Sequence, residues 1–432
     1  MLYFLSLIKK IKSSEFLRDV NILVIGTIIS QGVAILAIPI LSRIFNPNDY
    51  GLLALFSSVL AITANIVTLS YPIRIILPKT DFESQQVVLI SIFFSVGIGF
   101  CLLLLSYLLP SKFINSFGLG TLGKWLSLAI FFGIILSFIN TLNYWFNRNS
   151  LYKKIALLQI LQSIILTSFS LIMAFLSIEN GLILSQIFTF SILLIIFTLF
   201  SGLKFNSYHF VGLIKIIKKH KNAPKYLYPG NLLDVITLQL PFLLITLWFS
   251  QEMTGYYRMA FSCLNLPAAF FGAAIAQIFY KKFSQIWPDA AAAKILLKKT
   301  WLLLFVIGFP IFLIIAFAGE TVFSFGLGSS WKTAGSIASI LTLMCFFSLI
   351  HSPTSTTILA MGNEYLLLIF SGVALVYRTL SLYIGYLQND LLLGLKIFVA
   401  LEIAQIIIYQ YVVMKKINMQ IILNKQRANN LN

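Results

Sequence analysis

Long apolar stretches separated by short polar ones fill the sequence from end to end. Ten charge-free stretches lie between these charged residues: Asp19 and Arg43, Asp49 and Arg74, Glu83 and Lys112, Lys124 and Arg148, Lys154 and Glu179, Glu179 and Lys204, Asp234 and Glu252, Arg258 and Lys281, Lys299 and Glu320, and Lys332 and Glu364. Charged residues interrupt two further apolar segments, 365–388 and 391–414. Because about 20 apolar residues cross the hydrocarbon core as a helix, the pattern predicts an all-α integral membrane protein with about twelve transmembrane helices.

The distribution of basic residues predicts the orientation. With twelve spans both termini lie on one side, and that side receives 23 of the 31 Lys and Arg residues. Such a bias is typical of cytoplasmic loops, so both termini are predicted to be cytoplasmic. The same basic residues explain the net charge of +18, because they act as topology signals and contact anionic membrane lipid. No loop is long enough for a module that reads nucleic acid, so nucleic-acid binding is excluded.

The chain reads as two matching halves. Gly51 and Gly255 follow the first and the seventh predicted helix and lie 204 residues apart. Six spans per half predict parallel repeats, as in secondary transporters that hold substrate between the halves. The predicted parts are an N-terminal six-helix bundle at 1–203, a basic cytoplasmic connector at 204–228, a C-terminal six-helix bundle at 229–414 and a cytoplasmic tail at 415–432. The two bundles are expected to surround a central cavity.

Two short amphipathic segments are predicted to lie on the membrane surface rather than cross it. One is the N-terminal segment 2–8, whose apolar residues precede the lysines and so reverse the order of a signal peptide. The other is 210–221 in the connector, with apolar residues on one helical face and lysines on much of the rest. An ordinary solvated linker is the alternative for the second segment.

Three charged residues fall inside the last two spans. Arg378 lies midway along one, and Lys396 and Glu402 lie on the next. Charges at this depth are costly and suggest function by default. Two interpretations stay open for Arg378: a cation lining a water-filled cavity, or a buried pair with Glu402 that joins the two helices. Since cations outnumber carboxylates here, a cavity would favour an anion such as a lipid-linked diphosphate.

Other charged residues lie nearer the ends of their spans. Arg74 and Arg258 are further candidate cavity cations, although snorkelling to the interface explains them equally well. Asp234 is a candidate substrate contact, with helix capping or a pair with a lysine as the alternative.

A cluster of amide and aromatic residues ends the fourth predicted helix. Asn140, Asn143, Tyr144 and Trp145 combine amides, a ring hydroxyl and aromatic faces. Sugars bind through such groups, so this cluster is a candidate sugar contact. An interfacial aromatic belt is the alternative.

Enzyme signatures are missing from the sequence. It contains no GxSxG, HExxH or Walker motif, and its three cysteines are scattered among the spans. No catalytic residue, cofactor or metal site is predicted, and ATP is not expected to drive the protein directly.

Several motifs are shared with a known family. They are Ile38 to Gly51, Ile75-Ile76-Leu77-Pro78-Lys79, Pro224-Lys225-Tyr226, Gln239-Leu240-Pro241, Gly255 to Ala260, and Pro267 followed by Ala276-Gln277-Ile278-Phe279. With them the chain resembles the bacterial oligosaccharide flippases, the O-antigen and capsule branch of the multidrug/oligosaccharidyl-lipid/polysaccharide exporter superfamily. One departure is Ser70-Tyr71-Pro72, where these flippases often have Arg-Tyr-Glu.

The resemblance implies two six-helix bundles and alternating access in a bacterial inner membrane. The implied substrate is an oligosaccharide repeat unit on undecaprenyl diphosphate, flipped from the cytoplasmic to the periplasmic leaflet. Ion coupling through Glu402 or Asp234 is implied, with a polysaccharide polymerase and a chain-length regulator as further partners.

Two other functions stay open. One is a cation-coupled multidrug antiporter of the same superfamily, which should carry more deep carboxylates. The other is a membrane-embedded glycan polymerase or ligase, which usually has a large periplasmic loop that this chain lacks. A pure scaffold for polysaccharide assembly is a third possibility.

Overall fold

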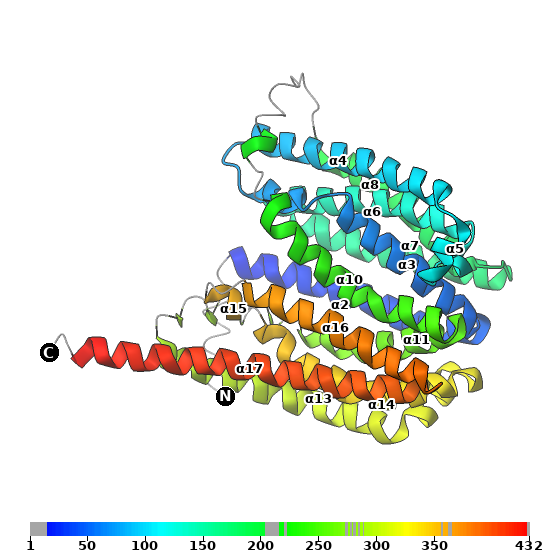
Figure 1. Ribbon diagram of the computed structural model, residues 1–432. Coiled ribbons are helices and arrows are strands. Elements are labelled where there is room, and N and C mark those ends of the chain that lie inside the picture. The colour runs from blue at the N-terminus through cyan, green and yellow to red at the C-terminus, as the bar shows by residue number, and fades with distance from the viewer. Residues whose placement is uncertain are drawn as a thin grey trace. The chain divides into compact units, whose positions relative to one another are not determined.

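The computed structural model is almost entirely helical (Figure 1). It describes residues 15–203, 216–219, 223–272, 275–276, 279, 282–283, 286–287, 289–355, 357–361 and 365–429. The long helices are α2 (Glu15–Ile44), α3 (Pro47–Ile66), α4 (Asp81–Leu108), α6 (Trp125–Arg148), α7 (Tyr152–Phe175), α8 (Gly181–Ser201), α10 (Tyr228–Trp248), α11 (Gln251–Pro267), α13 (Ala290–Leu327), α14 (Lys332–His351), α16 (Tyr365–Leu387) and α17 (Leu391–Asn429). Shorter elements are η1 (Tyr71–Ile76), α5 (Ser111–Ser116), η2 (Gly120–Leu122), η3 (Ala223–Leu227), η4 (Ala268–Gly272), η5 (Ser329–Trp331), η6 (Ser352–Thr354) and α15 (Thr357–Ala360).

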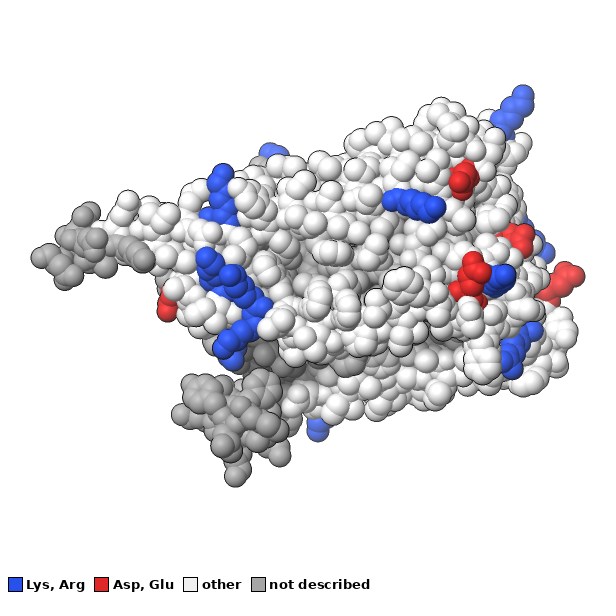
Figure 2. Space-filling view, turned by 90° about the horizontal axis from the view of Figure 1, so that it is seen from below, with Lys and Arg blue, Asp and Glu red and all other residues white. Residues whose placement is uncertain are grey.

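Eleven helices in the described residues are long and apolar enough to cross a membrane. The twelfth long helix, α11, has 17 residues and continues into the π-helical turn η4. The prediction of an all-α membrane protein with about twelve helices is therefore confirmed. The surface suits lipid: Phe317 is 87% exposed and Leu199 79% exposed. On the face in Figure 2, charged side chains gather toward the two ends, and the stretch between them is almost entirely uncharged.

The chain forms two compact units, an N-terminal unit (Met1–Gln239) and a C-terminal unit (Leu240–Asn432). In the first, α2 packs against α7, and α6 contacts α3, α4 and α8. In the second, α13, α14 and α17 lie side by side, and α16 pairs with α17 (Figure 1). The predicted surface segment 2–8 lies outside the described residues. The predicted surface segment 210–221 also lies outside them, except for residues 216–219. The boundaries predicted from the sequence for the two bundles, the connector and the tail remain predictions.

Helix α3 begins where a shared motif of the sequence predicts a turn. The Asn46 Oδ1 accepts from the Asp49 backbone N–H at 3.1 Å, and Asp49 Oδ2 accepts from the Asn46 N–H at 3.0 Å. Pro47 occupies the first helical position, where its missing N–H leaves no bond unmade. This reciprocal capping stabilises the start of the helix.

Close contact between α3 and α6 depends on a glycine. A Cβ at Gly133 would lie 2.6 Å from Thr63 Cβ and 3.0 Å from the Leu60 carbonyl oxygen. Small residues of this kind let membrane helices approach closely. The contact matters because both helices supply residues to the site described below.

Replacing Gly133 by alanine is expected to force α3 and α6 apart. Overpacking of this kind costs about 1–3 kcal/mol, so the melting temperature of the detergent-solubilised protein should fall. Gly97→Ala on α4 is the matched control, because a Cβ there meets nothing within 4 Å. An equal melting temperature for the two variants would contradict the close packing.

Candidate functional site

A polar crevice of about 570 Å³ lies within the N-terminal unit. Helices α3, α6 and α10, together with the turn after α3 and the start of η1, supply its walls. Its lining residues are Ala61, Ala64, Asn65, Thr68, Ser70, Pro72, Ile73, Leu136, Asn140, Asn143, Tyr144, Asn231, Asp234, Val235, Leu238 and Gln239. Amides, hydroxyls and one carboxylate therefore share a single hollow.

Three of the predicted sugar contacts line this crevice from α6. Asn140, Asn143 and Tyr144 follow a spacing of three and four residues, which places them on one helical face. Within the described part of the chain, none of these three side chains makes a hydrogen bond. The Asn65 Oδ1, opposite them on α3, is buried and also has no partner there. Asn140, Asn143, Tyr144 and the Asn65 Oδ1 thus offer donors and acceptors that the described part of the chain leaves unused.

Helix α10 is held to this wall by two long-range hydrogen bonds. Asn231 Nδ2 donates to Ser70 Oγ at 3.1 Å, and Ser58 Oγ donates to Gln239 Oε1 at 2.9 Å. Asp234 lies between these anchors on the same helix and presents an exposed carboxylate to the crevice. The structure therefore brings Asp234 together with three of the predicted sugar contacts.

The turn between α3 and η1 has an uncommon backbone. Leu69 and Ser70 both have positive φ, at 48° and 58°. For residues other than glycine this conformation costs roughly 1–2 kcal/mol each. The hydrogen bond from Asn231 holds Ser70 at the crevice wall, so packing maintains the strained turn where polar groups converge.

Trp145, the fourth predicted sugar contact, does not line the crevice. It is 5% exposed, and its Nε1 donates to the Ser201 carbonyl at 2.9 Å. The ring therefore ties the end of α6 to the end of α8.

A Trp145→Phe substitution is expected to remove one hydrogen bond and to leave a small cavity, because the phenyl ring is smaller than the buried indole. The protein should lose about 1 kcal/mol of stability from the hydrogen bond and a further amount from the cavity, seen as a drop in melting temperature, with no change in transport. A loss of transport at an unchanged melting temperature would show that Trp145 contacts the substrate.

In the C-terminal unit, Arg378 and Glu402 form a buried pair. Arg378 Nη2 lies 2.8 Å from Glu402 Oε1, and its Nε donates to Glu402 Oε2 at 3.0 Å. Tyr377 also donates to Glu402 Oε2 at 2.6 Å, and the guanidinium lies 5.5 Å from the Phe398 ring centre. Both charged side chains are 12% exposed. The pairing is one of the two arrangements expected from the sequence, and a bidentate Arg–carboxylate pair is among the strong ones.

Close packing of α16 on α17 makes this pair possible. A Cβ at Gly385 would meet the Gly394 Cα at 2.8 Å, so the backbones touch near the turn. The same hairpin then places Arg378 and Glu402 at one level.

The other predicted cations occupy separate places. Arg74 lies on η1 of the N-terminal unit, where its Nε is buried without a hydrogen-bond partner among the described residues. Arg258 is half-buried on α11, and Lys396 is exposed on α17. None of these cations lines the polar crevice. Among the described residues, no group of three His, Cys, Asp or Glu side chains could hold a metal ion.

Comparison with known proteins settles the family. Residues 40–336 match the family described as "Polysaccharide biosynthesis protein". The chain belongs to this family. No curated protein matches it significantly.

Solved structures of related fold come from membrane transporters. The chain is similar to the lipid II flippase MurJ in an inward closed conformation, with 16% identity, a TM-score of 0.73 and coverage of 90% of this chain and 87% of that one. It is similar to an inward-facing multidrug resistance MATE family transporter of the MOP superfamily, with 14% identity, a TM-score of 0.66 and coverage of 90% and 95%. A MOP superfamily transporter from Pyrococcus furiosus, whose binding pocket is described as having reverse polarity, gives 14% identity, a TM-score of 0.59 and coverage of 93% and 96%.

These likenesses show the fold that the resemblance of the sequence motifs implies. At such identities they establish the fold, and with the family match they identify this polysaccharide biosynthesis protein as having the fold of a transporter.

Sequence reasoning missed five polar residues of the crevice: Asn65, Thr68, Ser70, Asn231 and Gln239. A signal for them exists, because each is a polar residue in or next to a membrane helix, where burial without a partner is costly. For a substrate rich in hydroxyl groups, uncharged amides within membrane spans are as informative as charged residues.

Proposed function

We propose that this protein is a flippase for an oligosaccharide repeat unit linked to undecaprenyl diphosphate. It moves the repeat unit from the cytoplasmic to the periplasmic leaflet of a bacterial inner membrane by alternating access. The observation that carries the proposal is the polar crevice, whose Asn140, Asn143 and Tyr144 side chains keep their hydrogen-bonding capacity free of partners in the described residues. Membership of a polysaccharide biosynthesis family supports the same substrate class.

The physical task is to carry hydroxyl groups across a layer that cannot hydrogen-bond to them. The hydrocarbon core is about 30 Å thick, and each unmet polar group in it costs several kcal/mol. A polar crevice replaces the water lost by the sugar, while the lipid chain stays in the bilayer. No covalent bond changes, so no catalytic residue is needed.

We assign the diphosphate to basic side chains and the coupling to Asp234. Arg378, Lys396, Arg74 and Arg258 are the proposed cations for the anionic substrate. Of the two proposed coupling carboxylates, Asp234 lines the polar crevice and Glu402 does not. A change in the charge of Asp234 is therefore felt where the sugar binds. A polymerase and a chain-length regulator would receive the flipped repeat unit.

A multidrug antiporter is the second candidate, because the crevice carries a carboxylate and its described lining has no Lys or Arg. Such a lining suits an organic cation. The fold likeness to a multidrug resistance transporter is compatible with it. An enzyme that polymerises or ligates glycans has no comparable support.

Reconstitution into liposomes separates these functions. The purified protein is expected to expose a labelled undecaprenyl-diphosphate oligosaccharide to a membrane-impermeant probe on the opposite side, and to leave ethidium distribution unchanged. Asp234→Asn should abolish any dependence of this movement on an ion gradient. Movement of ethidium without movement of the oligosaccharide would establish the antiporter instead.

A further inference from the structure

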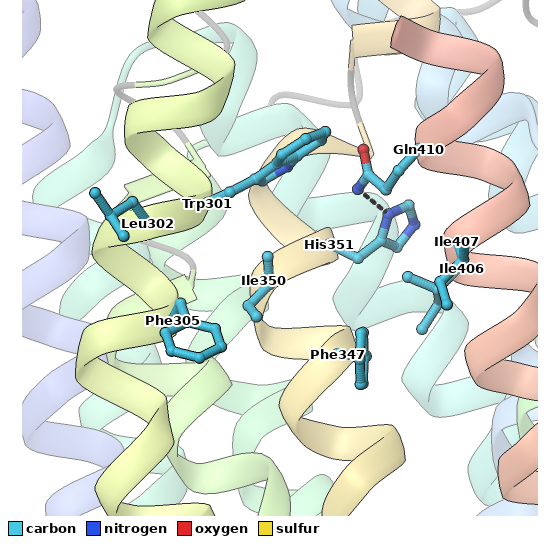
Figure 3. Close-up of a pocket in the computed structure, with 9 residues that line it drawn as sticks. All are labelled: Trp301, Leu302, Phe305, Phe347, Ile350, His351, Ile406, Ile407 and Gln410. Atoms are coloured by element: carbon cyan, nitrogen blue, oxygen red, sulfur yellow. Dashed lines mark hydrogen bonds between the residues drawn. The ribbon is translucent and has the colours of Figure 1, made fainter.

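A second cavity, of about 390 Å³, lies in the C-terminal unit and is mostly apolar (Figure 3). We call it the apolar crevice. Helices α13, α14 and α17 line it with Trp301, Leu302, Phe305, Phe347, Ile350, His351, Ile406, Ile407 and Gln410. Volume and lining are typical of a small-molecule site, which is apolar with a few placed polar groups. Leu302 is 65% exposed and Ile407 53% exposed, so the crevice opens on the apolar surface.

One end of the apolar crevice is polar. Gln410 Nε2 lies 2.8 Å from His351 Nδ1 and donates to Thr354 Oγ1 at 3.0 Å, and Trp301 Nε1 donates to the same hydroxyl at 3.3 Å. The Gln410 Oε1 is buried and has no hydrogen-bond partner in the described part of the chain. Figure 3 shows Trp301, His351 and Gln410 toward one end and Phe305 and Phe347 toward the other. The lining of the apolar crevice therefore changes from polar at the His351 and Gln410 end to apolar at the Phe305 and Phe347 end.

Lysines lie beyond the polar end. On α13, Lys298 precedes Leu302 by four residues and Phe305 by seven, so all three lie on one helical face. Lys298 and its neighbour Lys299 are both exposed. A long helical side chain leans toward the N-terminus of its helix, so Lys298 extends away from the apolar part of the crevice.

Helix α17 brings a further lysine to the same end. A hydrogen bond of 2.8 Å from Lys294 Nζ to Asn418 Oδ1 shows that the start of α13 lies beside the later part of α17. Lys415, five residues after Gln410, is exposed on that part. Between Ala290 and Gly319 on α13, and from Ile403 to Gln426 on α17, the sequence has no Asp or Glu. The lysine end is thus positively charged on both helices.

We propose that the apolar crevice binds one anionic phospholipid of the surrounding bilayer. Its phosphate contacts Lys298, Lys299 and Lys415, its glycerol region lies beside His351 and Gln410, and one acyl chain passes toward Phe305. The order of charge, hydrogen-bonding groups and hydrocarbon matches that of a phospholipid. Basic pockets between membrane helices bind such headgroups. This inference is independent of the flippase proposal.

Lipid binding to the full-length protein tests the inference by native mass spectrometry. Phosphatidylglycerol is expected to bind more tightly than phosphatidylethanolamine with the same acyl chains. The double variant Lys298→Gln, Lys299→Gln should weaken phosphatidylglycerol binding about 30-fold, at about fivefold per basic residue, and leave phosphatidylethanolamine unchanged. Ile407→Trp fills the exposed mouth and should weaken both lipids by the same factor.

The matched control removes two exposed lysines of the N-terminal unit, Lys79→Gln with Lys153→Gln. It is expected to bind phosphatidylglycerol as the unaltered protein does. An equal loss in the control, or equal binding of the two lipids by the unaltered protein, would overturn the proposal. So would displacement of phosphatidylglycerol by uncharged undecaprenol in the unaltered protein but not in Ile407→Trp, since the crevice would then be an isoprenoid site.

Discussion

Replacing Asn140 and Asn143 together by alanine is expected to lower oligosaccharide flipping by about 30-fold. Each amide lines the polar crevice and makes no hydrogen bond among the described residues, so each is available to a sugar hydroxyl. A hydrogen bond contributes about 1 kcal/mol net, and two lost bonds give roughly that factor. Surface polysaccharide in a complemented strain, or flipping in liposomes, measures the effect.

The melting temperature should stay the same, because these amides make no hydrogen bond to the described part of the protein. Asn147→Ala is the control: Asn147 is exposed on the same helix and does not line the crevice. Flipping by Asn147→Ala should equal that of the unaltered protein. Full activity of the double variant would remove the crevice from the transport pathway, and Tyr144→Phe would then be expected to be active as well.

Much of the fold could be predicted because lipid imposes a simple rule on the backbone. Every span must satisfy its own hydrogen bonds, so a charge-free stretch of sufficient length becomes a helix. The stretch between Lys299 and Glu320 accordingly lies within α13. The strained turn at Leu69 and Ser70 could not be predicted, because neither residue favours a positive φ. It is held by Asn231, 161 residues away from Ser70.

The candidate site was predictable in part, for a similar reason. The spacing of Asn140, Asn143 and Tyr144 places them on one face from local geometry alone. Their meeting with Asp234 depends on how α10 packs, which the sequence pattern does not contain. For Arg378 the sequence left both a pair with Glu402 and a place in an open cavity possible, because both are compatible with two adjacent helices. Only the side-chain positions distinguish them.

Replacing Arg378 by methionine is expected to destabilise the protein strongly. Among the described residues, the Glu402 carboxylate would then keep only its hydrogen bond from the Tyr377 hydroxyl. Removing one partner of a buried ion pair costs about 3–5 kcal/mol, because the other charge is left uncompensated. The melting temperature in detergent should fall accordingly, and Glu402→Gln should lower it as well, since that change leaves the Arg378 charge buried without a carboxylate.

The double variant Arg378→Met, Glu402→Met separates stability from transport. Apolar residues of similar volume can replace a buried ion pair with little or no loss of stability, so its melting temperature should return close to that of the unaltered protein. Oligosaccharide flipping should stay lost, because the proposed role of Arg378 in holding the anionic substrate needs its charge. Resistance to cationic dyes should not change in either variant. Recovery of flipping together with stability would show that the pair serves to join α16 to α17, and the diphosphate would then have to be bound by Arg74, Arg258 or Lys396.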